Sequence, residues 1–194
     1  MSTFYLIRHG LRESQDENTH LNEAGVKQAE MTGQYFGSKN IHYIFVSPAE
    51  RTLQTARILN NYLQVPQSTD NRLKERMVYK PVCGTYEAFL EEWDKTMADR
   101  DYEPTHGDSA RFAGDRITSL LDELCEDKNY LLISHGGTIG DAVRNLFADS
   151  LFTLTTDSIK KIQWLDIPEC SVTEIQKIEG RYLLQRVGDT SHLV

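Results

Sequence analysis

The chain alternates short apolar runs with stretches in which apolar residues recur every three or four positions. Compact runs of this kind predict buried strands at residues 4–7, 41–46 and 130–133. The helical spacing predicts helices over 24–39, from Pro48 onward, over 110–126 and after Gly136. Strands separated by helices are typical of a layered α/β domain with a mainly parallel sheet.

Two of these helices carry start signals. Asn22 is the expected N-cap of the first, and Glu23 suits the positive end of its dipole. For the second, Ser47 is the expected N-cap, Pro48 the first helical residue, and Glu50 the partner that completes a capping box.

The carboxyl-terminal part of the chain reads as strands at residues 160–167, 171–178 and 181–187. The Glu179-Gly180 turn joins the last two in a hairpin, which adds an antiparallel edge to the sheet. Residues 66–108 show less regularity. We therefore predict one domain over residues 1–194, a three-layer α/β/α sandwich with a mainly parallel central sheet and an antiparallel edge strand.

Composition narrows the class of protein. The chain has 194 residues, with 21 Lys and Arg against 29 Asp and Glu, a net charge of −8. An acidic chain of this kind is a poor candidate for binding nucleic acid or acidic membranes, and its apolar runs fall far short of the roughly 20 residues that cross a bilayer. Three cysteines without paired spacing predict neither a disulfide framework nor a metal site. We expect a cytoplasmic protein.

Basic residues follow three of the predicted strands. The first strand ends in Arg8-His9-Gly10, the second is followed by Ser47-Pro48 with Arg51 one turn on, and a third ends in Ser134-His135-Gly136-Gly137. The carboxyl ends of strands are where sites form in such sheets. Two arginines and two histidines facing one another need an anion between them, and a phosphoryl group suits them. The helix that starts near Gly136 adds backbone N–H groups for the same anion.

These three motifs, in this order, resemble the histidine phosphatase superfamily, the phosphoglycerate mutase-like group. The resemblance implies that His9 is the nucleophile that becomes phosphorylated, and that Arg8, Arg51 and His135 hold the phosphoryl oxygens. It implies that Glu75 protonates the leaving group. No cofactor is implied, and the partner is a small phosphorylated substrate.

The sequence also departs from the family's pattern. In the loop over residues 11–20, Leu11 and Arg12 replace the Glu or Gln and the Thr or Ser of many members, so Ser14 or Asn18 is the candidate phosphate ligand. The segment Gly84-Thr85-Tyr86-Glu87-Ala88 resembles the family's Gly-x-Trp-Glu-Gly but lies farther from the acid than usual. Glu87 is therefore the alternative proton donor to Glu75.

The function expected is a metal-independent phosphatase that hydrolyses phosphomonoesters, of a small metabolite or a phosphoprotein, through phospho-His9. The alternatives are a phosphoglycerate mutase-type phosphotransferase and a catalytically weak binding or scaffold protein. Residues 76–108 are the expected substrate-side cap. Eight acids stand against Lys95 and Arg100 in residues 87–108, which would disfavour polyanionic substrates. Homodimers are common in the family, and the apolar residues 151–154 are the candidate contact.

Overall fold

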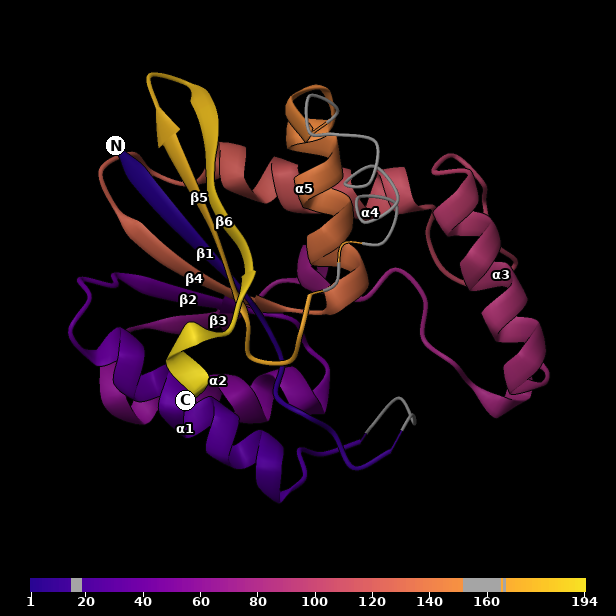
Figure 1. The fold of residues 1–194 in the computed structure, drawn as a ribbon, viewed down its shortest axis with the longest axis horizontal. Helices are drawn as coiled ribbons and strands as arrows, with labels where there is room; N and C mark the ends of the chain where they lie inside the picture. The colour runs from indigo at the N-terminus through magenta and orange to yellow at the C-terminus, as the bar shows by residue number, and fades with distance from the viewer. Residues whose placement is uncertain (15–18, 152–164, 166) are drawn as a thin grey trace.

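The computed structural model describes residues 1–14, 19–151, 165 and 167–194. Within them the chain forms one six-stranded sheet with the order β3-β2-β4-β1-β5-β6 (Figure 1). The strands are β1 Ser2–Arg8, β2 Tyr43–Val46, β3 Gln67–Thr69, β4 Asn129–Ser134, β5 Val172–Ile178 and β6 Arg181–Asp189.

The register of the sheet brings three strand ends to one edge. β1 and β2 both pair in parallel with β4, and Ile7 and Val46 both lie opposite Ile133. Arg8 at the end of β1 lies opposite Ser134 at the end of β4. On the other side β5 is antiparallel to β1, and β6 is antiparallel to β5. The mainly parallel sheet with an antiparallel edge is thus confirmed.

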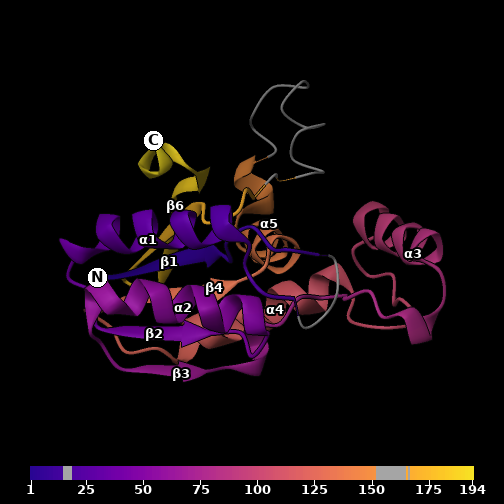
Figure 2. The same ribbon diagram turned by 90° about the horizontal axis from the view of Figure 1, so that it is seen from below.

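Helices cover both faces of this sheet, as predicted. α1 Glu23–Gly37 and α2 Glu50–Leu63 lie on one face and α4 Ala110–Glu123 and α5 Gly136–Leu151 on the other, whereas α3 Tyr86–Ala98 lies on neither. Successive residues of β1 point to opposite faces, so Tyr5 and Ile7 pack with α1 and α2, and Phe4 and Leu6 pack with α4 and α5. Figures 1 and 2 show this three-layer arrangement, with α3 beyond the end of the sheet.

Local signals explain several boundaries. Asn22 caps α1 as predicted, since its side-chain oxygen accepts a hydrogen bond from Gly25 N at 2.8 Å. The predicted hairpin is also present, and its two turn residues, Glu179 and Gly180, have φ of 50° and 76°. Positive φ at both positions gives the turn a twist that matches the flanking strands.

The predicted capping box at α2 is wrong. This helix begins at Glu50 after Ala49, which makes no side-chain cap. Ser47 lies outside the helix, and its hydroxyl is 2.8 Å from His135 Nε2. The Ser47 hydroxyl, which the local motif predicts to cap the helix N-terminus, is therefore hydrogen-bonded to His135, a residue 88 positions further along the chain.

Residues 66–108 contain more structure than the sequence pattern indicated. Strand β3, helix α3 and the 3₁₀ turns Asn71–Leu73 and Pro81–Cys83 all lie there. Strand β3 was missed because its three residues are polar, and helix α3 was missed because it buries only Thr96. The strand predicted over 160–167 falls outside the described residues except at 165 and 167, which are not in a strand. Of the predicted dimer contact only residue 151 is described, so that contact stays a prediction.

Candidate functional site

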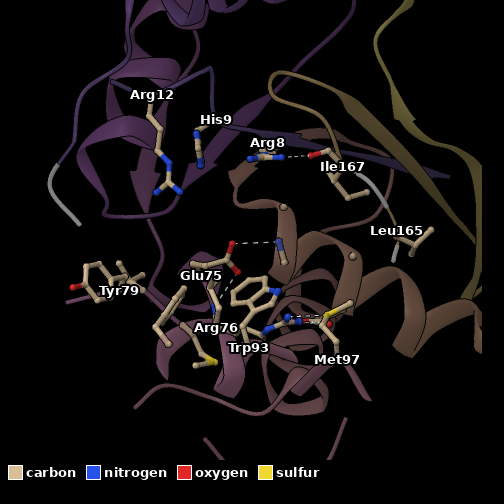
Figure 3. A pocket seen from close by; sticks show the side chains of 18 of the residues that line it. Arg8, His9, Arg12, Glu75, Arg76, Tyr79, Trp93, Met97, Leu165 and Ile167 are labelled. Atoms are coloured by element: carbon tan, nitrogen blue, oxygen red, sulfur yellow. Dashed lines mark hydrogen bonds and ion pairs between the residues drawn. The ribbon is translucent and has the colours of Figure 1, made fainter. Parts of the chain in front are cut away.

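A cavity of about 300 Å³ opens where β1 ends, between α3 and the start of α5. Figure 3 shows Arg8, His9 and Arg12 on one side of it and Glu75 and Trp93 facing them. The residues that line the cavity come from β1 and its following loop, α2, the 75–79 segment, α3, α5 and two residues before β5. They are Arg8, His9, Arg12, Arg51, Glu75, Arg76, Met77, Val78, Tyr79, Tyr86, Phe89, Leu90, Trp93, Met97, Gly136, Gly137, Gly140, Asp141, Arg144, Leu165 and Ile167.

His9 is buried at the wall of this cavity, with 4% of its surface exposed. Its Nδ1 lies 2.9 Å from the carbonyl oxygen of Gly10. Because a carbonyl can only accept, Nδ1 carries the proton and Nε2 holds the lone pair. Burial lowers the pKa of His9 well below its ordinary value, and the nearby His135 and Arg51 lower it further. The ring is therefore a neutral imidazole with a free nucleophilic nitrogen.

The turn after His9 is held by close backbone packing. Gly10 N donates to Thr55 Oγ1 at 3.1 Å, and a Cβ at Gly10 would lie only 2.6 Å from the carbonyl oxygen of Gly25. Glycine at both positions lets the loop cross the start of α1 in direct contact. This crossing fixes the carbonyl that orients His9.

Arg8 lies against the first turn of α5. Its Nη1 donates to Ile167 O at 2.7 Å, and its Nη2 forms an ion pair with Glu169 at 2.5 Å. Among the described residues, no atom accepts a hydrogen bond from Arg8 Nε, which is buried. A buried guanidinium donor of this kind is ready for an anionic oxygen in the cavity.

Arg51 and His135 form a chain of hydrogen bonds behind His9. Arg51 Nη2 lies 3.0 Å from His135 Nδ1, and because a guanidinium only donates, that nitrogen accepts. His135 Nε2 therefore carries the proton and donates to Ser47 Oγ at 2.8 Å. His135 is neutral, since burial lowers its pKa well below the ordinary value and Arg51 adds to the effect.

The structure thus places His135 beside His9, with ring centroids 5.3 Å apart, yet both of its nitrogens are engaged within the protein. In this arrangement His135 orients Arg51, and its direct contact with a phosphoryl group stays a prediction. Ser47 is a site residue that the sequence analysis assigned to a helix cap instead.

Glu75, in the segment before α3, faces Arg8, His9 and Arg12 across the cavity and is hydrogen-bonded to the start of α5 (Figure 3). Its Oε1 accepts from Arg76 N at 3.0 Å and from Thr138 N at 3.0 Å, and its Oε2 accepts from Gly137 N at 3.2 Å. Thr138 Oγ1 also lies 2.9 Å from Oε1. The carboxyl group is therefore held in one orientation by the backbone at a helix N-terminus, and Oε2 is its less occupied oxygen.

Other predicted residues do not meet in the cavity. Ser14 is exposed and does not line the cavity, and Asn18 falls outside the described residues. Glu87 is exposed on α3 and does not line the cavity either, so the structure brings Glu75 and not Glu87 to His9. Arg12, from the same loop, is partly buried and does line the cavity.

The expectation that the acidic segment disfavours polyanionic substrates stays a prediction, and the structure shows how its side chains are placed. The residues of α3 that line the cavity are Tyr86, Phe89, Leu90, Trp93 and Met97. The acids on α3 do not line it, and Glu92, for example, is bound by Lys95 and Tyr102. Helical spacing separates the two kinds of side chain onto different faces. Asp108 lines a neighbouring cavity that also includes Arg51 and Glu75, and it forms an ion pair with Arg116.

Comparisons with known proteins identify the family and the fold. The family model of the histidine phosphatase superfamily (branch 1) matches residues 4–190, and the chain belongs to this superfamily. A probable phosphoglycerate mutase GpmB from Yersinia pestis is 27% identical over 214 aligned positions, covering 100% of this chain and 95% of the relative.

Solved structures share the fold at lower identity. YhfR from Bacillus stearothermophilus superposes with a TM-score of 0.76 at 22% identity, with full coverage of both chains. A mycobacterial glucosyl-3-phosphoglycerate phosphatase gives 0.75 at 20% identity, covering 97% of this chain and 99% of its own. A phosphoserine phosphatase from Entamoeba histolytica, solved with 3-phosphoglyceric acid, gives 0.75 at 21%, with full coverage of both.

Among the residues that the structure describes, no three His, Cys, Asp or Glu side chains are grouped so as to hold a metal ion. None of the helices in the described part of the chain is long and apolar enough to span a membrane.

Proposed function

We propose that this protein is a metal-independent phosphatase that hydrolyses a small phosphomonoester through a phosphohistidine intermediate on His9. The observation that carries the proposal is the state of His9: a neutral ring, held by Gly10 O through Nδ1, in a cavity wall that also carries Arg8, Arg12 and Arg51. A neutral, oriented imidazole is a competent nucleophile.

In the first step, His9 Nε2 attacks the phosphorus atom, and the bond between phosphorus and the ester oxygen breaks. Glu75, protonated, gives its proton to that oxygen, and an alcohol leaves. The arginines bind the phosphoryl oxygens, where negative charge concentrates in the transition state. Arg51 reaches them with its orientation fixed by His135 and Ser47.

In the second step, water attacks the phosphorus atom of phospho-His9 and gives a proton to the Glu75 carboxylate. The phosphorus–nitrogen bond breaks, inorganic phosphate leaves, and His9 returns to the neutral ring. Glu75 is then protonated and ready for the next cycle, so one carboxyl group serves as acid and base in turn.

A mutase-type phosphotransfer is the second candidate, because curated relatives with 27% identity carry the name probable phosphoglycerate mutase. The two activities share the first step and differ in the acceptor, which is water for a phosphatase and a second substrate hydroxyl for a mutase.

The test measures phosphate release from 4-nitrophenyl phosphate, with chelator present, by the wild type and by His9→Ala. We expect release by the wild type only, and acid-labile phosphate on the protein after a rapid quench. A matched control is His42→Ala, which changes a histidine beside β2 that does not line the cavity. Equal rates for wild type and His9→Ala would refute the proposal, and conversion of a phosphoglycerate without phosphate release would favour the mutase.

A further inference from the structure

One face of α3 forms the wall of the cavity opposite the arginines. Tyr86, Phe89, Leu90, Trp93 and Met97 line the cavity, and their spacing of three or four places them on one stripe of the helix. Other residues of the protein cover this stripe only in part, since Tyr86 is 38% and Leu90 42% exposed. An apolar helix face that points into a cavity is available to an apolar ligand.

The wall is continuous and aromatic. The ring of Tyr79 lies 5.2 Å from that of Tyr86 and 5.8 Å from that of Phe89, and the Phe89 ring lies 6.1 Å from that of Trp93. These centroid distances are those of packed aromatic pairs. The rings therefore pack against one another and form one connected surface along the cavity.

The charge nearest to this wall is already neutralised. Arg76 lies beneath Trp93, with its guanidinium carbon 3.8 Å from the centre of the ring. Its Nη1 donates to both carboxylate oxygens of Asp141, at 3.0 and 2.8 Å. Arg76 therefore adds no unpaired charge to the aromatic surface that an incoming group meets.

The aromatic wall begins beside the carboxyl group of Glu75, the proposed proton donor. A Cβ at Gly137 would lie 2.6 Å from Glu75 Oε1 and 2.7 Å from the Cη2 of Trp93. The proton donor and the edge of the indole thus approach the same point. A group attached to the oxygen that Glu75 protonates starts its course beside Trp93.

We infer that the leaving group is uncharged and apolar, an aryl group or one of similar flat shape, and that it packs against the cavity face of α3. This inference rests on the proposed phosphatase function and names its substrate class. The cavity volume of about 300 Å³ lies at the lower end of the range for small-molecule sites. It fits a phosphoryl group with a compact ring better than a folded phosphoprotein.

A substrate with a second anionic group is the competing class. Arg144 lies on the cavity two turns of α5 beyond Gly136, and its Nη1 is buried with no hydrogen-bond acceptor among the described residues. Were Arg144 the specificity determinant, carboxylated or bisphosphorylated esters would be preferred, and Arg144→Met would abolish that preference.

The experiment compares kcat/KM for 1-naphthyl phosphate, glycerol 2-phosphate and 3-phosphoglycerate. We expect the naphthyl ester to exceed both of the others by at least about tenfold. Aryl and alkyl leaving groups also differ in reactivity. The decisive readout is therefore the effect of Phe89→Ala on the ratio of kcat/KM for 1-naphthyl phosphate to kcat/KM for glycerol 2-phosphate. Loss of one aromatic contact is worth about 0.5–1.5 kcal/mol, which lowers this ratio about 2- to 12-fold.

Phe112→Ala is the matched control, because Phe112 is 56% exposed on α4 and does not line the cavity. It should leave the ratio unchanged. A preference for 3-phosphoglycerate that Arg144→Met removes would overturn the inference, as would an unchanged ratio in Phe89→Ala. Failure of the proposed function itself looks different, since none of the three esters would then release phosphate and no acid-labile phosphate would form on His9.

Discussion

Replacing Arg76 tests how the buried charges beneath the cavity are balanced. The side chains of Arg76 and Asp141 are 0% and 2% exposed and form an ion pair at 2.8 Å. Arg76→Met removes the cation, keeps much of the apolar volume, and leaves Asp141 buried without its main partner. Breaking a buried pair on one side costs about 3–5 kcal/mol, a large part of the roughly 5–15 kcal/mol by which domains are stable.

The double variant Arg76→Met with Asp141→Leu separates this explanation from simple loss of packing. Exchanging a whole buried pair for apolar side chains is often neutral or stabilising. We therefore expect the double variant to lose less than about 2 kcal/mol, including the contact between Arg76 and Trp93. The interaction energy between the two sites follows from the cycle of single and double variants.

The pH dependence supplies a second test of the same reasoning. Burial raises the pKa of Asp141 from 3.8 to about 6, and Arg76 is the main group that opposes this rise. The folded state binds this proton more tightly than the unfolded state, so the group's contribution to stability falls as pH rises from about 4 to 6. Without Arg76 the pKa rises further, and the fall continues above pH 6.

The assay is urea unfolding of all four proteins at pH 5 and pH 8. The deficit of Arg76→Met should be small at pH 5, where Asp141 is protonated, and larger at pH 8. A deficit that is equal at both pH values would refute the electrostatic account, as would a double variant whose loss equals the sum of the single losses.

Three further predictions concern the site itself. The pKa of His9 is well below its ordinary value, so kcat/KM corrected for substrate ionisation should stay constant as the pH is lowered through 6.5. A fall in kcat/KM on the acid side with its midpoint at or above pH 6.5 would contradict this. Glu75→Gln should lower kcat for an alkyl phosphate about 10²- to 10⁴-fold, because the alkoxide then leaves without a proton. With 4-nitrophenyl phosphate, whose leaving group needs no proton, the same variant should give a burst of one nitrophenol per enzyme. An equal loss for both esters without a burst would rule out the acid and base role of Glu75. Gly137→Ala should lower kcat at least about tenfold, because the added Cβ would lie closer than 3.0 Å to Glu75 and to Trp93. The control is Gly37→Ala, whose added Cβ meets nothing within 4 Å. Equal rates for the two variants would refute the clash.

The parts of the fold that the sequence predicted are those with a strong local cause. The runs over 4–7 and 130–133 became the buried strands β1 and β4, because a fully buried strand has no polar face to interrupt its apolar pattern. Asn22 and the Glu179-Gly180 turn were predictable for a similar reason, since each acts through its own neighbours in the chain. Helix α3 was missed because its apolar stripe lines a cavity and not the core.

In the site, likewise, the residues were predictable from local pattern and their hydrogen bonds were not. Arg8, His9, Arg51 and His135 follow strands or begin helices, so the rule that sites form at the carboxyl ends of parallel strands was enough to bring them together. Their hydrogen bonds were not predictable. Ser47 carries a strong local signal for a helix cap, yet its hydroxyl is taken by His135, and that competition is decided by two segments that meet only in the folded sheet.

The sequence by itself determined the superfamily, the order of the layers and the residues of the basic cluster, because these depend on local pattern and on motifs at strand ends. Tertiary structure alone decided which carboxylate faces His9, that Arg12 and not Ser14 reaches the cavity, and that the acids of α3 do not line it. The physical reason is that each of these outcomes depends on contacts between segments that are far apart in the chain. The contacts of Arg76 with Asp141 and with Trp93 are of this kind.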